Sequence, residues 1–203
     1  MPTRRRLLCA TLSGTATLVL GGCAGGSLPP PPRWVRMPTD AQGPAAAPSA
    51  AVSGVWQLMA PVQLPGHLDR DTLLVPQGAA GLQGLGGARW AEPLRDAVPR
   101  LLRQDLERAF GVPVWTTPLP PGVRPTRQLR IEMTAFDVMP EQRGVTLAAR
   151  WILADTQGGS RPSVFDARFD TLAGGSDADS LVLAHRQALA ELSRRILVSV
   201  LGG

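Results

Sequence analysis

The residues RQLRIEMTAFDV, at positions 127–138, constrain the fold most, because apolar and polar side chains alternate along them. Leu129, Ile131 and Met133 fall on one side of an extended chain, whereas Arg130 and Glu132 fall on the other. This pattern predicts a strand with one buried face and one solvent-facing face. GVTLAARWILAD (144–155) and SVFDARFDTL (163–172) are predicted to form two further strands, separated by the turn residues TQGGSRP.

Residues 94–110 have the apolar period of an amphipathic helix. Pro93 suits the first turn of this helix and Gly111 suits its end. Pro99 does not fit, because a proline inside a helix removes a hydrogen bond and clashes with the preceding turn. We therefore expect Pro99 to kink the helix or to delay its start.

A second amphipathic helix is predicted at the C-terminal end of the chain, beginning near GGSDADS. Either Ser176 or Asp177 can cap it, because a short oxygen-bearing side chain accepts hydrogen bonds from the free N–H groups of a first turn. The residues predicted to be buried are Leu181, Ala184, Ala188, Leu192 and Ile196, with Leu189 and Val200 beside them.

The segments before the first helix are shorter. RWVRMP and DTLLVP are predicted to be short strands, and QGAAGLQGLGG (77–87) a flexible loop. GVWQLMAPVQLP is predicted to be a strand with Val55, Gln57 and Met59 on one face and Trp56 and Leu58 on the other. Strands combined with two amphipathic helices predict an α/β or α+β sandwich.

The N-terminus has the order of an export signal. Arg4, Arg5 and Arg6 precede an uncharged run, residues 7–20, which is shorter than the about 20 residues that a membrane-spanning helix needs. Leu20-Gly21-Gly22-Cys23 resembles the lipobox of bacterial lipoproteins, in which the chain is cut before the cysteine and its sulfur is acylated. We expect cleavage after Gly22 and a lipid on Cys23. Residues 3–8 also resemble a twin-arginine motif, so the export route stays open.

These features divide the chain into three parts. Residues 1–22 are the predicted lipoprotein signal peptide, and residues 23–33 are a lipidated Gly/Pro tether whose prolines favour an extended conformation. Residues 34–203 are predicted to form one domain, in which 38–53 is an irregular Pro/Ala loop.

The charge of the chain argues against nucleic-acid binding. The net charge of +5 falls to +2 without the three arginines of the signal, and the 18 remaining basic residues are all arginines that face 16 acidic residues. A nucleic-acid-binding surface needs clustered basic residues and stacking aromatic residues, and neither pattern is present. Cys9 leaves with the signal and Cys23 is acylated, so the sequence predicts neither a disulfide nor a cysteine-based metal site.

The remaining sequence offers little chemistry. His67 and His185 are isolated and are expected to be ordinary polar residues rather than metal ligands. The chain has no G-x-S-x-G motif, and without any lysine the glycine-rich segment 78–87 cannot be a P-loop. The SDADS segment lacks the glycine and the distant glutamate of a calcium loop and fits a helix cap. We expect no catalytic residue, no metal and no cofactor.

Two stretches carry a family resemblance. VQLPGHLDRDTLLVPQG (62–78) followed by ARWAEPLRDAVPRLLRQDLERAFG (88–111) resembles the PqiC-type auxiliary lipoproteins of MCE (mammalian cell entry) transport systems, which are ABC-transport auxiliary lipoproteins. The resemblance extends over about residues 34–197. The positions that match the motif are Val62, Leu64, Pro65, His67, Leu68, Asp69 and Arg70, followed by Trp90, Ala91, Glu92, Pro93 and Leu94.

The resemblance implies both fold and function. It implies a mixed β-sheet of about five strands flanked by two main helices, similar to the TolB amino-terminal domain. It also implies a non-enzymatic outer-membrane lipoprotein that faces the periplasm and binds an MCE-domain transport protein, as a homo-oligomeric ring, in a system that moves phospholipid between the two membranes. Ala24 is not the aspartate that retains lipoproteins at the inner membrane of enteric bacteria, which agrees with an outer-membrane location.

Two other functions stay open on the sequence alone. One is an outer-membrane assembly or scaffold lipoprotein, resembling those of lipopolysaccharide assembly, and the other is a periplasmic hydrolase. A neighbouring gene for an MCE protein would argue against the first, and a pocket with converging polar side chains would favour the second.

Overall fold

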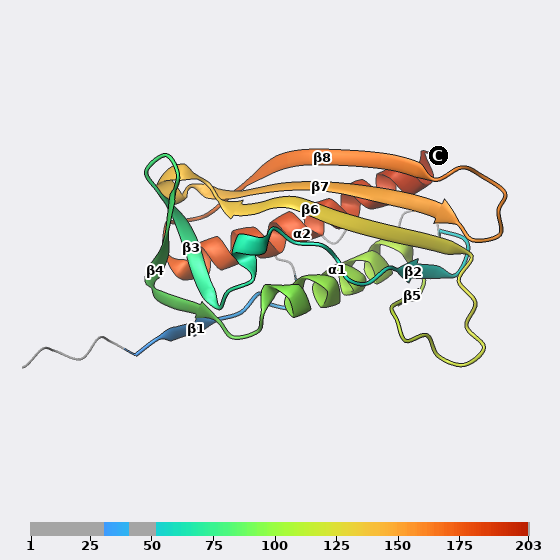
Figure 1. Ribbon diagram of the computed structural model, residues 1–203, viewed down its shortest axis with the longest axis horizontal. Coiled ribbons are helices and arrows are strands. Elements are labelled where there is room, and N and C mark those ends of the chain that lie inside the picture. The colour runs from blue at the N-terminus through green and yellow to red at the C-terminus, as the bar shows by residue number, and fades with distance from the viewer. Residues whose placement is uncertain (1–30, 41–51, 203) are drawn as a thin grey trace, which may run out of the picture. The chain divides into compact units, whose positions relative to one another are not determined.

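The alternating segments form the long strands of a sheet in the computed structural model, which describes residues 31–40 and 52–202 (Figure 1). The elements in chain order are β1 (Arg33–Val35), β2 (Trp56–Leu58), η1 (Gly66–Leu68), β3 (Thr72–Gln77), β4 (Gly81–Trp90), α1 (Leu94–Phe110), β5 (Val114–Trp115), β6 (Arg127–Val138), η2 (Pro140–Gln142), β7 (Gly144–Asp155), β8 (Ser163–Leu172) and α2 (Ala178–Leu201). The predicted mixed α/β architecture is confirmed, and a small second sheet is added to it.

The main sheet has five strands in the order β5-β2-β6-β7-β8. β6, β7 and β8 are antiparallel neighbours, whereas β2 runs parallel to both β5 and β6. Both helices cover one face of this sheet, the face that buries Leu129, Ile131 and Met133 (Figure 1). The other face carries exposed side chains such as Arg130 and Arg150, as the predicted alternation requires.

Helix α2 follows its prediction closely. Asp177 is its N-cap and accepts a hydrogen bond from the Ser180 backbone N–H at 3.0 Å. The hydrogen bonds from Ser180 also lower the pKa of the Asp177 carboxyl below its ordinary value. The five residues predicted to be buried are all buried, as is Leu189, while Val200 is half-buried. Among the described residues, no helix is long and apolar enough to span a membrane.

Helix α1 differs from its prediction at Pro99. The helix begins at Leu94 and continues through Pro99 to Phe110, so the expected delay of its start is wrong. The first turn forms because Asp96 and Ala97 both donate to the Pro93 carbonyl. Burial of Val98, Leu101 and Leu102 against the core offsets the hydrogen bond that proline cannot donate. At the other end Gly111 has a left-handed φ of 70°, as predicted for a helix stop.

The expected flexible loop at 77–87 is wrong, because most of it belongs to strand β4. β3 and β4 form an antiparallel hairpin, and β1 adds to β4 in parallel to complete a three-stranded sheet. The register shifts between Thr72 and Leu74, so β4 contains a bulge. Gly86 and Gly87 adopt φ values of 48° and 73° there, which glycine tolerates best. Glycines that indicate a loop in the sequence thus permit a bulged strand.

Strand β2 is shorter than predicted, and its two faces do not differ in burial. Trp56, Gln57 and Leu58 are all buried, because β2 lies between β5 and β6 and is covered on both sides. The Gln57 side chain is satisfied there, since it accepts a hydrogen bond from Gln128 at 3.1 Å and donates to Thr117 at 3.3 Å. Val55 and Met59 lie outside the strand.

A buried ion pair joins the two helices. Arg186 of α2, whose side chain is fully buried, contacts the Asp105 carboxylate of α1 at 2.6 Å through both terminal nitrogens. The same guanidinium donates to the carbonyls of Pro38 and Thr39 at 2.9 and 2.8 Å. The segment that follows β1 is thereby hydrogen-bonded to α2, and through the ion pair it is linked to α1. Most of the predicted irregular loop 38–53 lies outside the described residues.

Strand β8 is the free edge of the main sheet. It pairs with β7 over its whole length, and within the described residues its outer side pairs with nothing. Phe165 and Phe169 on its inner face are half-buried, with Phe165 stacked on Trp151 and the Arg195 guanidinium over Phe169. Asp166, Arg168 and Asp170 are exposed on its other face.

Candidate functional site

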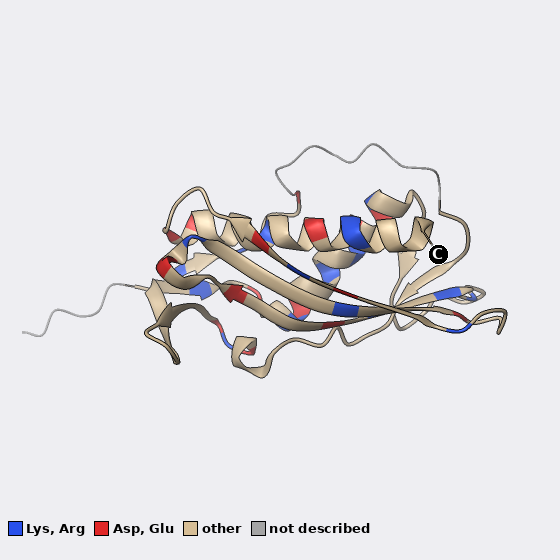
Figure 2. Cartoon of the chain, turned by 90° about the horizontal axis from the view of Figure 1, so that it is seen from above, with Lys and Arg blue, Asp and Glu red and all other residues tan. Residues whose placement is uncertain are grey.

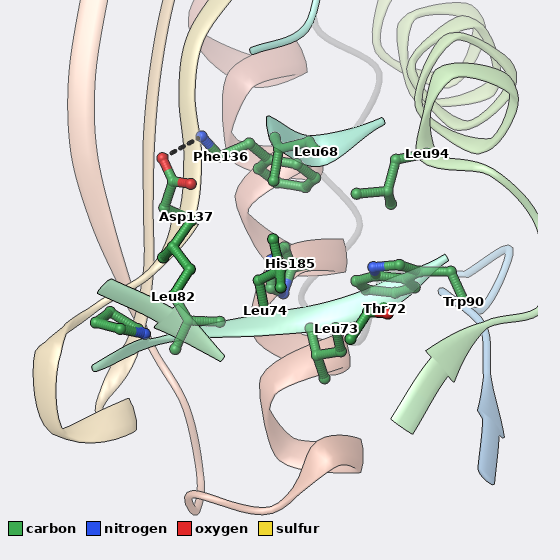
Figure 3. Close-up of a pocket in the computed structure, with 12 residues that line it drawn as sticks. Leu68, Thr72, Leu73, Leu74, Leu82, Trp90, Leu94, Phe136, Asp137 and His185 are labelled. Atoms are coloured by element: carbon green, nitrogen blue, oxygen red, sulfur yellow. Dashed lines mark hydrogen bonds between the residues drawn. The ribbon is translucent and has the colours of Figure 1, made fainter. Parts of the chain in front are cut away.

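The two sequence stretches that carry the family resemblance meet at an apolar pocket. Leu68 from η1, Trp90 at the end of β4 and Leu94 at the start of α1 line one cavity of about 80 Å³ (Figure 3). The hairpin β3–β4 supplies Leu73, Leu74, Pro76 and Leu82, while β6 supplies Phe136, Asp137 and Val138, and α2 supplies His185. The motif therefore encodes the junction of the hairpin, both helices and the main sheet.

His185 lines this pocket and is nearly fully buried, at 2% exposure. Its Nδ1 lies 2.8 Å from the Leu181 carbonyl, so this nitrogen carries the proton and donates. The ring packs edge-on against Phe136 and Trp90, with ring centroids 4.8 and 5.5 Å away. Burial lowers the pKa of His185 to about 4, against smaller opposing effects of the Leu181 carbonyl and Asp137, so the side chain is neutral at pH 7.

His67 lies on the outer side of the same junction. Its Nε2 is 2.5 Å from the Asp137 carboxylate, and both side chains are partly exposed. Asp137 thus lies beside one histidine and acts electrostatically on the other. Two histidines and one carboxylate come together here from positions 67, 137 and 185, which no local spacing in the sequence indicates.

Few reactive groups accompany His185 and Asp137 in the lining of the pocket. Thr72 is the one hydroxyl among the residues that line the pocket. Within residues 31–40 and 52–202, no three histidine, cysteine or acidic side chains are arranged to hold a metal ion. The pocket can accept a small apolar group, because its lining is almost entirely hydrocarbon.

Ion pairs brace the motif around the pocket. Asp69 accepts from Arg95 of α1 at 2.5 Å, and Glu92 contacts Arg100 of α1 at 2.6 Å. Glu92 raises the pKa of the Arg100 guanidinium above its ordinary value by accepting this hydrogen bond. Two acidic residues of the motif therefore pair with arginines on the first two turns of α1.

A larger and more polar cleft lies at the opposite end of the sheet. It has a volume of about 650 Å³, and the turn between β7 and β8 and the C-terminal end of α2 form its walls. Arg127 and Asp155 form an ion pair of 3.2 Å in it, and Arg161 and Leu201 also line it. This cleft was not predicted, because its residues come from four separated segments.

Charge does not mark either site. Figure 2 shows acidic and basic residues interspersed along strands and helices rather than gathered on one surface, as the small net charge of the predicted mature chain leads us to expect. Gly22 and Cys23, the predicted cleavage and lipidation residues, lie outside the described residues.

Comparisons with known proteins agree with this picture. Residues 38–197 match the model of the family described as the ABC-type transport auxiliary lipoprotein component. The fold is similar to the crystal structure of protein XCC0632 from Xanthomonas campestris, assigned to the DUF330 family, with a TM-score of 0.66 and 16% identity over 83% of this chain and 95% of that one. An uncharacterized protein of known structure has a TM-score of 0.65 and 16% identity over 84% of this chain and 99% of its own. No functionally curated protein sequence matches. Since the family model covers most of the sequence, the chain belongs to the ABC-type transport auxiliary lipoprotein family.

Proposed function

We propose that this lipoprotein is anchored in the outer membrane through Cys23 and serves an MCE-type ABC transport system that moves phospholipid between the inner and outer membranes, contributing to envelope integrity. The observation that carries the proposal is the family match over residues 38–197, in a chain whose residues 20–23 also resemble a lipobox. The family supports an accessory role in transport, and the resemblance of the 62–78 and 88–111 stretches supports the MCE type.

The site geometry supports a binding role rather than catalysis. Two of the concave sites among the described residues are an apolar pocket lined by His185, in which Thr72 supplies the one hydroxyl, and an open cleft of mixed polarity. Both suit contact with lipid or protein. We propose that the partner is an MCE-domain protein, bound by a ring of several copies of this lipoprotein.

Replacing Cys23 with alanine tests the anchor. The Cys23→Ala chain cannot be acylated at this position, so we expect it to move to the soluble periplasmic fraction or to keep its signal peptide uncut. Two acyl chains suffice for stable anchoring, at about 0.8 kcal/mol per buried CH₂ group. Fractionation and mass spectrometry of the N-terminus measure both outcomes. A Cys23→Ala chain that matures normally and still sediments with outer membranes would contradict the anchor.

The partner is tested by capture in cells. The chain has no lysine, so amine-reactive reagents cannot crosslink its side chains. A photoreactive amino acid at Val198, in the exposed end of α2, is the appropriate probe, with Asp96 on the exposed side of α1 as the comparison position. We expect the chromosomally encoded MCE protein in the crosslinked product and in detergent co-purification. Light scattering of the purified lipoprotein measures the ring.

The outcomes separate the alternatives. A strictly monomeric lipoprotein would remove the ring but leave the transport role. If neither crosslinking from position 198 nor co-purification captures an MCE protein, and a deletion strain keeps its envelope sensitivity unchanged, the transport role is wrong and the scaffold function takes its place.

A further inference from the structure

The point at which the tether joins the domain distinguishes one end of the molecule. The chain enters the described fold at Arg33, the first residue of β1. β1, the tip of the β3–β4 hairpin and the turn between β6 and β7 lie toward the same end of the fold, with β1 on the lower side of this end and the hairpin tip and the turn on its upper side in Figure 1. β3 packs against η2 in that turn. We call this the anchor end. The opposite end holds the β7–β8 turn and the C-terminal end of α2.

The anchor end exposes three large apolar side chains. Trp34 of β1 is 59% exposed, Leu82 near the hairpin tip is 48% exposed, and Leu172 at the end of β8 is 73% exposed. Trp34 is opposite Arg89 in the β1–β4 ladder, and Leu172 is opposite Gly144 at the start of β7. Three separate elements therefore present apolar groups at the anchor end, and Val164, Val198 and Leu201 are exposed at the opposite end, so the tether decides which end meets the membrane.

The length of the preceding chain limits where this end can go. From Cys23 to Arg33 the tether spans at most about 35 Å, at 3.3–3.6 Å per residue. A tether this short holds the anchor end at a high effective concentration near the surface in which the lipid is embedded, so a weak interaction suffices for contact.

We propose that the anchor end lies on the phospholipid bilayer, with Trp34, Leu82 and Leu172 at the boundary between headgroups and acyl chains. Tryptophan favours this boundary because its ring is apolar and its N–H is polar. The inference rests on the proposed acylation of Cys23. It adds an orientation of the domain. The long axes of β6, β7 and β8 lead away from the membrane surface, and the polar cleft at their far end faces the periplasm.

Quenching of tryptophan fluorescence tests this contact. The full-chain lipoprotein, purified with its acyl anchor, is placed in liposomes of phosphatidylethanolamine and phosphatidylglycerol with or without bromine on the acyl chains. Trp56, Trp90 and Trp151 are buried, and Trp115 lies toward the opposite end in β5. We expect bromine to quench the emission of the unmodified protein, Trp34→Phe to lose most of this quenching, and Trp115→Phe to retain it. Equal quenching in the two variants, or none in the unmodified protein, would overturn the proposal.

A second measurement decides the orientation if Trp34→Phe or Trp115→Phe folds poorly. Leu82→Cys and Val198→Cys each carry an environment-sensitive dye, since Cys23 is blocked by its lipid. The dye at position 82 should shift to shorter wavelength on reconstitution, and the dye at position 198 should not. Mass spectrometry of the N-terminus shows whether Cys23 is acylated, so a failure of the anchor can be distinguished from a failure of the bilayer contact. If Cys23 proves not to be acylated, a chain held on nickel-chelating lipid by an N-terminal histidine tag decides the orientation by the same comparison.

Discussion

The buried His185 links the stability of the fold to pH. Its pKa of about 4 in the folded chain lies below the ordinary value of 6.5. As the pH falls below 6.5, the unfolded chain binds a proton at this position and the folded chain does not, so unfolding becomes easier down to about pH 4. The shift corresponds to about 3 kcal/mol in the free energy of unfolding.

Urea unfolding at several pH values measures this effect. His185→Gln should lose about 3 kcal/mol of pH dependence between pH 6.5 and 4, and His67→Gln, at the exposed side of the same junction, should keep it. Identical pH profiles for His185→Gln and the unmodified chain would show that His185 is not the group responsible.

The buried ion pair of Arg186 and Asp105 is the second feature that we expect to contribute strongly to the free energy of unfolding. Arg186→Met leaves the buried Asp105 carboxylate with Arg108, 2.8 Å away, as its remaining charged partner, so we expect a cost of about 3 kcal/mol, the lower end of the range for breaking a buried pair. Arg194→Met removes a partly exposed partner of Glu191 and should cost less than about 1 kcal/mol. Urea unfolding at pH 7 compares them. The pair stabilises little if the two variants have similar midpoints.

At the scale of elements, the start of β7 tolerates no side chain. A Cβ added to Gly144 would overlap the Thr171 carbonyl oxygen of β8 and lie 2.9 Å from the Leu172 Cα, so strand backbones must separate. We expect Gly144→Ala to lower the free energy of unfolding by about 3 kcal/mol. Gly111→Ala adds a Cβ in open space at φ +70° and should cost about 1 kcal/mol. Equal thermal midpoints of the two variants would contradict this explanation.

The elements also show what a sequence can predict. The strands β6, β7 and β8 and the helix α2 can be predicted from the sequence. One face of each is buried and the other is exposed, so apolar residues recur with the period of a strand or of a helix. The two faces of β2 cannot be predicted in this way, since a strand buried on both sides shows no alternation of apolar and polar residues. The sequence of β4 predicts a loop because glycine serves both a loop and a bulge, and only pairing with β1 and β3 decides between them.

At the scale of the whole molecule, the pocket could be predicted only in part. The family motif contains Leu68, Trp90 and Leu94, yet nothing in its spacing shows that they share a cavity with Phe136 and His185. The cleft at the opposite end has no motif at all, because it forms where a turn, a strand end and a helix end meet. Side chains brought together by long-range packing leave no periodic pattern.

The free edge of β8 also bears on whether the protein aggregates. No other described strand pairs with the outer side of these ten residues, so the edge is a template on which another chain can add, and copies held on one membrane by the proposed lipid anchor would be crowded there. Stacking of identical β8 strands in register would place Asp166 beside Asp166 and Arg168 beside Arg168, and this repulsion opposes fibre formation. Replacing Asp166, Arg168 and Asp170 with threonine keeps strand propensity but removes the repulsion, so we expect faster growth of thioflavin-positive aggregates. Three surface charges would then keep this lipoprotein colloidally stable.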